Sequence, residues 1–115
     1  MKAVLQSYLE TMLWAECDGD GLPFDHTYDT DDIHPDTVKQ AVRDIENFIE
    51  LSGNLLDGED DKQIGHDFWL TRGRHGAGFW DGDYEENKGQ KLTEIAKTFG
   101  PLSVWVDKDG KLHTI

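Results

Sequence analysis

Residues 66–81 read HDFWLTRGRHGAGFWD, and this stretch decides the fold that the sequence predicts. Polar and apolar residues alternate from His66 to Arg72, and the segment is rich in aromatic side chains, a pattern typical of a β-strand. A glycine on either side of the next two residues favours a reversal of the chain. The sequence therefore predicts a β-hairpin whose second strand runs from Ala77 to Asp81.

Three other segments show the three- and four-residue spacing of apolar side chains that is typical of amphipathic helices. The first covers residues 1–16 and is expected to end at the Asp-Gly-Asp-Gly sequence that follows. The second begins at Pro35, which suits the first turn of a helix, and ends at Gly53. The third covers residues 86–99.

The end of the chain predicts a second hairpin. Strands over residues 102–106 and 112–115 are joined by an Asp-Lys-Asp-Gly turn. With a single helical turn expected at residues 60–65, the main elements follow the order helix, helix, hairpin, helix, hairpin. This order predicts one α+β domain over residues 1–115, with about three helices packed on a small antiparallel sheet of about four strands.

The composition excludes several classes of protein. The 115 residues include 24 Asp or Glu against 11 Lys or Arg, a formal net charge of −13. Binding to a nucleic-acid backbone needs an excess of positive charge, so direct binding to nucleic acid is not expected. No apolar run approaches the ~20 residues of a membrane span, and residues 1–16 lack the pattern of a secretory signal. Together with the single cysteine, Cys17, these features favour a cytoplasmic protein without membrane association.

The negative charge is concentrated in one part of the chain. Residues 3–38 hold nine carboxylates and no Lys or Arg, whereas residues 88–115 hold five Lys and three carboxylates. Residues 17–36 are expected to form a loop, and loops of this length are often functional. An acidic surface either keeps a protein soluble or binds a basic partner by charge complementarity, and DNA mimicry is one form of such binding. The carboxylates expected to bind a partner are Asp18, Asp20, Asp25, Asp29, Asp31, Asp32, Asp57, Glu59, Asp60 and Asp61.

The sequence shows no motif for metal binding or catalysis. The acidic segments lack EF-hand spacing, and the histidines and the cysteine lack the short paired spacing of zinc ligands, so neither a metal nor a cofactor is expected. No nucleophile elbow or phosphate-binding glycine loop is found, so no catalytic residue is assigned and an enzyme is less expected than a binding protein.

The alternative hypothesis is a small-ligand-binding or catalytic module centred on the predicted 66–81 hairpin. A carboxylate beside an imidazole and a guanidinium group can form an acid–base site or an anion site. Aromatic strands in a small protein are first of all core, so a structural role for these polar residues is the stronger interpretation. The candidate ligand-binding residues are His66, Asp67, Arg72, His75 and Asp81.

The HDFWLTR…HGAGFWD core resembles a family of small bacteriophage and prophage proteins without an established activity. The likeness extends to the Gly89-x-x-Leu92-Thr93 segment and to the ending VDKDGK at residues 106–111, and it covers about residues 40–115. It implies a phage or mobile-element origin and the cytoplasm of an infected bacterium as the compartment. The sequence thus predicts a non-enzymatic phage-type accessory protein that binds a basic or nucleic-acid-binding protein of the host or the phage, and it assigns no oligomeric state.

Overall fold

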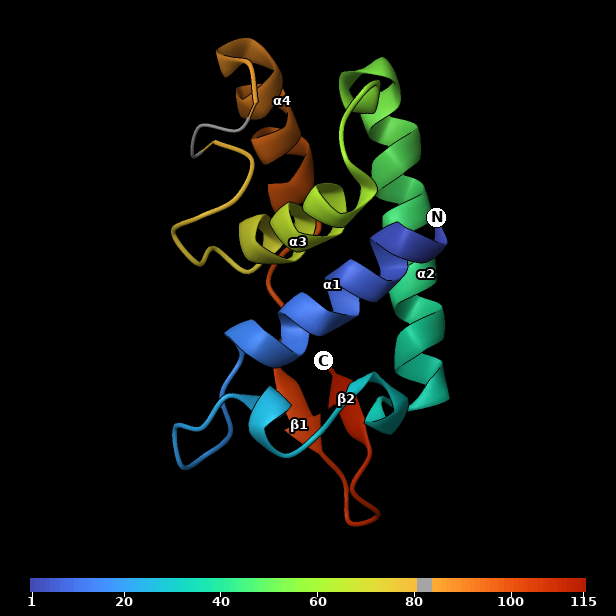
Figure 1. Cartoon of the computed structure of the whole chain (residues 1–115), viewed down its shortest axis with the longest axis vertical. Coiled ribbons are helices and arrows are strands. Elements are labelled where there is room, and N and C mark those ends of the chain that lie inside the picture. The colour runs from blue at the N-terminus through green and yellow to red at the C-terminus, as the bar shows by residue number, and fades with distance from the viewer. Residues whose placement is uncertain (81–83) are drawn as a thin grey trace.

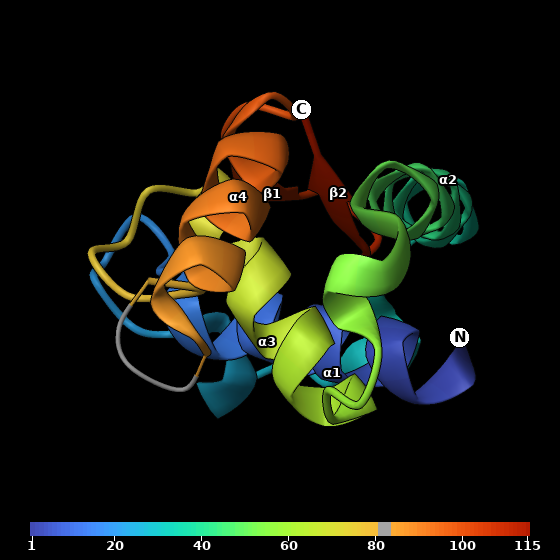
Figure 2. The same cartoon turned by 90° about the horizontal axis from the view of Figure 1, so that it is seen from above.

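The structure, a computed structural model, describes residues 1–80 and 84–115 and is built mainly of helices (Figure 1). Its elements, in chain order, are α1 (Lys2–Ala15), the 3-10 helices η1 (Phe24–His26) and η2 (Thr30–Asp32), α2 (Pro35–Ser52), the 3-10 helix η3 (Gly53–Leu56), α3 (Asp61–Arg72), α4 (Glu86–Lys97), and the strands β1 (Val104–Val106) and β2 (Leu112–Thr114). The two strands form one antiparallel sheet. In Figure 2, α2 is seen nearly end-on at the right of the view, and α4 lies to the left of the centre.

The predicted fold of about four strands and three helices is wrong. Residues 66–72 belong to helix α3 rather than to a strand, and residues 78–80 form a bend and a turn. The end of the predicted hairpin, Asp81, lies outside the described residues. The single helical turn expected at residues 60–65 is the beginning of the longer helix α3. The described part of the chain is a helix-rich α+β fold with four α-helices and one two-stranded sheet.

Helix α3 shows no helical period in the sequence because it is buried on nearly all sides. Residues 64–65 and 67–72 are all buried, so no polar face marks the helix, and the polar members of the run find partners inside the protein. The local start signal is nevertheless present. The Asp60 carboxylate accepts a hydrogen bond from the backbone N–H of Gln63 at 3.1 Å, as a typical N-cap residue does.

A glycine allows α1 and α3 to cross at close range. A Cβ atom at Gly65 would overlap with backbone atoms of Val4 and Tyr8 on α1. The aromatic core forms around this crossing: the Tyr8 ring lies 5.5 Å from the Phe68 ring, and the Phe68 ring stacks on Phe48 of α2 at 4.3 Å. Helix α3 thus joins α1 to α2 through the centre of the core.

The predicted C-terminal hairpin is present at one end of the molecule, next to the start of α2 (Figure 1). In its register Trp105 lies opposite His113, and the turn covers residues 107–110. The backbone N–H of His34 donates a hydrogen bond to the Leu112 carbonyl at 2.9 Å, and the rings of His34 and His113 stack at 4.6 Å. These contacts attach the hairpin to the N-terminus of α2.

Candidate functional site

The acidic loop between α1 and α2 is folded by some of its own aspartates. The Asp18 carboxylate accepts a hydrogen bond from the backbone N–H of Asp20 at 2.8 Å. At η2, the Asp32 carboxylate accepts one from the N–H of Asp29 at 3.0 Å, and the Asp29 carboxylate accepts one from the N–H of Asp31 at 2.9 Å. Side chains of this kind stabilise turns because they replace missing backbone partners. Three of the predicted partner-binding carboxylates therefore also shape the loop.

The other predicted carboxylates of this loop, on Asp20, Asp25 and Asp31, are exposed. In the described part of the chain, no Lys or Arg forms an ion pair with a carboxylate of residues 17–36. Surface charge of one sign attracts oppositely charged groups over a Debye length, about 8 Å at physiological ionic strength. The loop is therefore suited to attract positively charged groups.

A hollow with a volume of about 330 Å³ lies where α1 meets this loop. Three acidic residues, Glu10, Asp25 and Asp29, line it together with Tyr28. Ammonium and guanidinium groups form their stronger hydrogen bonds with carboxylates and also bind to the faces of aromatic rings. The hollow is thus chemically suited to a Lys or Arg side chain.

The second predicted acidic segment, residues 57–61, lies apart from the loop, in the upper half of Figure 1, whereas the loop lies in the lower half. Glu59 forms an ion pair with Lys88 at 3.5 Å. Asp60 caps α3, and Asp57 and Asp61 are exposed. The structure therefore distributes the ten predicted carboxylates over two regions.

The described candidate ligand-binding residues of the 66–81 stretch lie at different places along α3 and just after it. Asp67 and Arg72 are both buried, at different points along α3. His66 lies against α1, and His75 follows the helix in the next turn. Asp81 lies outside the described residues. His66, Arg72 and His75 contact different neighbours, Thr11, Asp44 and Glu16, and the acid–base or anion site considered from the sequence stays a prediction.

Arg72 joins three parts of the fold. Its side chain is 3% exposed and forms an ion pair with Asp44 of α2 at 2.7 Å. It also donates hydrogen bonds to the Tyr8 hydroxyl at 3.1 Å and to the carbonyls of Phe99 and Gly100 at 3.0 and 2.9 Å. These contacts connect α3 to α1, to α2 and to the chain after α4, which gives Arg72 a structural role.

The burial of Tyr8 predicts a loss of stability in alkaline solution. Burial raises the pKa of Tyr8 to about 12, although the neighbouring Arg72 guanidinium acts in the opposite direction. Because tyrosine ionises near pH 10 in unfolded chains, the folded protein holds this proton more tightly. The contribution of Tyr8 to the free energy of unfolding is expected to be constant below about pH 10 and to fall by about 2 kcal/mol by about pH 12.

Urea denaturation across this pH range measures the effect. The variant Tyr8→Phe should lose this part of the pH dependence, whereas Tyr28→Phe should keep it, because it leaves the buried hydroxyl in place. If the free energy of unfolding falls equally in the wild type and in Tyr8→Phe as the pH is raised, Tyr8 is not the cause of the loss.

Glu16 connects the end of α1 to Trp69 and His75, and residue spacing did not predict these contacts. Its Oε2 atom accepts a hydrogen bond from the Trp69 Nε1–H at 3.0 Å and lies 2.5 Å from Nε2 of His75. The two contacts attach the end of α1 to α3 and to the turn after it. Because the partners lie more than fifty residues away in the chain, no local spacing could indicate them.

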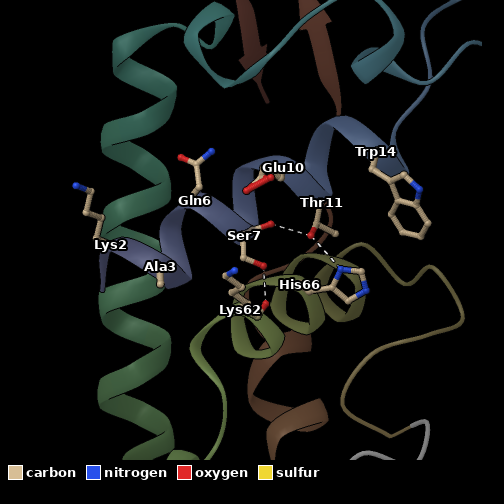
Figure 3. A pocket seen from close by; sticks show the side chains of 9 residues that line it. All are labelled: Lys2, Ala3, Gln6, Ser7, Glu10, Thr11, Trp14, Lys62 and His66. Carbon is tan, nitrogen blue, oxygen red and sulfur yellow. Dashed lines mark hydrogen bonds between the residues drawn. The ribbon is translucent and has the colours of Figure 1, made fainter.

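A groove of about 840 Å³ runs between α1 and α3 (Figure 3). Trp14 lies at one end, where its ring is 5.7 Å from that of His66, Lys2 lies at the other end, and Lys62 lies beside Ser7 between them. Trp14 is 56% exposed, which is unusual for so large an apolar side chain. Among the residues that line this groove, only His66 is a candidate predicted from the sequence.

Hydrogen bonds determine the tautomer of His66 in its neutral form (Figure 3). The Thr11 hydroxyl donates to the Ser7 carbonyl at 2.7 Å and therefore accepts from Nδ1 of His66, 3.1 Å away. The proton of the neutral ring then lies on Nδ1, and Nε2 keeps its lone pair. His66 thus has a defined orientation at the groove.

Metal binding is not indicated by the described residues, in which no group of three or more His, Cys, Asp or Glu side chains is arranged to hold an ion. Among the helices of the same residues, none combines the length and the apolar character needed to cross a bilayer. No protein-family model, curated protein or solved structure matches the chain.

Proposed function

We propose that the protein is a non-enzymatic binding protein that uses an acidic face to bind a basic segment of another protein. The acidic face consists of Glu10 on α1 and of Asp20, Asp25, Asp29 and Asp31 in the following loop. The observation that carries the proposal is the hollow lined by three of these carboxylates, on a loop that contains no Lys or Arg. Charge complementarity of this kind accelerates association and selects basic partners.

The likeness to phage proteins suggests the setting of this proposal. The partner is then a basic or nucleic-acid-binding protein of the bacterial host or the phage, met in the cytoplasm of the infected cell. A protein that ordinarily binds DNA presents Lys and Arg to phosphates, and exposed carboxylates can occupy the same basic surface. DNA mimicry is the more specific form of the proposal, and it requires competition with DNA.

Affinity capture from bacterial lysate tests the proposal with two variants of equal charge. The first removes four charges from the acidic face through Glu10→Gln, Asp20→Asn, Asp25→Asn and Asp31→Asn. The matched control removes four exposed charges from α2 and α4 through Glu46→Gln, Glu50→Gln, Glu86→Gln and Glu94→Gln. We expect the wild type and the control to retain the same basic protein at low salt and to release it at high salt. The acidic-face variant should not retain it.

Equal retention by the two variants would show that total charge, rather than the acidic face, holds the partner, and it would contradict the proposal. If the wild type recovers no basic protein at any salt concentration, the carboxylates only keep the protein soluble and the proposal is wrong. Duplex DNA added to the lysate should release the partner if the protein mimics DNA. Persistent retention in excess DNA would exclude mimicry while keeping a basic partner.

A further inference from the structure

The α1–α3 groove and the acidic hollow share an edge. Gln6 and Glu10 of α1 line both the groove and the hollow. The exposed Trp14 therefore lies in the groove on one side of Gln6 and Glu10, and the hollow with its carboxylates lies on the other side. An aromatic anchor surrounded by a polar rim is the usual anatomy of a protein–protein interface.

We propose that the groove and the hollow form one docking surface for a basic amphipathic helix of the partner. This inference rests on the proposed function and specifies the shape of the segment that is bound. The apolar face of the helix lies in the groove, and its Lys or Arg side chains reach over the α1 edge into the hollow. Helix-in-groove binding is a recurring mode of peptide recognition.

The groove has suitable dimensions for a helix of about three turns. Lys2 and Trp14 lie twelve residues apart on α1, which corresponds to about 18 Å along the helix axis. The side chains of Ala3 and Ser7 between them are small and permit a close approach of the partner's backbone (Figure 3). Trp14 offers a large exposed ring at the end of the groove, and tryptophan is enriched among residues that dominate binding energy.

Charge gives the bound helix a preferred orientation. Glu10, Asp25 and Asp29 attract its basic side chains to the hollow. Lys2 at the far end of the groove and Lys62 beside Ser7 repel the same side chains, and repulsion of this kind contributes to specificity. A second copy of the chain would bring a further net charge of −13 to this face, which opposes self-association.

Two synthetic peptides of the same composition, leucine and arginine, test the inference. In the first, the leucines recur at helical spacing and form one apolar face, and in the second the order is scrambled so that no such face forms. Isothermal titration calorimetry at constant ionic strength should show that the wild type binds the amphipathic peptide about tenfold more tightly than the scrambled one. Trp14→Ala should remove that difference.

The control Trp105→Ala removes a similarly exposed tryptophan, 45% exposed on β1, and should leave both affinities unchanged. Unchanged circular dichroism of both variants establishes that they are folded. Equal binding of the two peptides by the wild type, or full retention of the tenfold difference in Trp14→Ala, overturns the docking inference. The proposed function is tested separately. If the wild type binds both peptides and the acidic-face variant binds neither, the carboxylates are needed for binding and the proposed function is supported. Failure of both peptides to bind the wild type overturns the inference and leaves the capture experiment to judge the proposed function.

Discussion

The variant Arg72→Met is expected to lower the free energy of unfolding by about 3–5 kcal/mol, because it leaves the Asp44 carboxylate without its buried cationic partner. The carbonyls of Phe99 and Gly100 and the Tyr8 hydroxyl also lose a hydrogen-bond donor. Domains of this size are stable by about 5–15 kcal/mol, so the change is large enough to unfold part of the population at physiological temperature. Urea denaturation followed by circular dichroism measures it.

Two further variants separate the ion pair from the loss of packing. Arg43→Met removes an exposed arginine from α2 and should change the free energy of unfolding by less than about 0.5 kcal/mol. The double variant Arg72→Met with Asp44→Leu removes both charges, and its loss should be smaller than the sum of the two single losses. Two results would show that the buried pair does not stabilise the fold. One is a loss of free energy of unfolding in the double variant that equals the sum of the two single losses, and the other is a loss of less than about 1 kcal/mol for Arg72→Met.

The variant Gly65→Ala is expected to destabilise the protein by about 3 kcal/mol, although alanine is the better helix former. In an exposed helix the same change stabilises by about 1 kcal/mol. At this position the added Cβ would overlap with the Val4 carbonyl oxygen and lie 2.8 Å from the backbone nitrogen of Tyr8. Backbone atoms cannot rotate away as a flexible side chain can, so α1 and α3 must move apart and lose core contacts.

Gly19→Ala is the matched control for this prediction. Gly19 lies in the acidic loop, and a Cβ built there has no neighbour within 4 Å. Its free energy of unfolding should change by less than about 0.5 kcal/mol in the same denaturation experiment. A Gly65→Ala protein at least as stable as the wild type would contradict the close crossing of α1 and α3.

Helices at the surface were visible in the sequence because local chemistry marks them. Helix α2 begins at Pro35 and ends before Gly53, and its buried and exposed residues alternate with the helical period, so residue spacing alone located it. The β1–β2 hairpin was similarly indicated by its Asp-Lys-Asp-Gly turn. Helix α3 was assigned to a strand because its neighbours bury it from nearly every side and remove the polar face on which the helical period depends.

The candidate site likewise has features that the sequence indicated and features that only the structure showed. The sequence by itself determined the net charge of −13, the clustering of carboxylates in residues 17–36, and the absence there of a neutralising cation, since these depend only on composition along the chain. Only the tertiary structure decided that Asp18, Asp29 and Asp32 shape turns and that Asp25 and Asp29 line the hollow with Glu10. It alone placed Trp14 beside His66 and showed that His66, Arg72 and His75 contact different neighbours. The reason is physical: charge is a property of each residue, whereas a groove or a buried ion pair exists only where segments distant in the chain pack together.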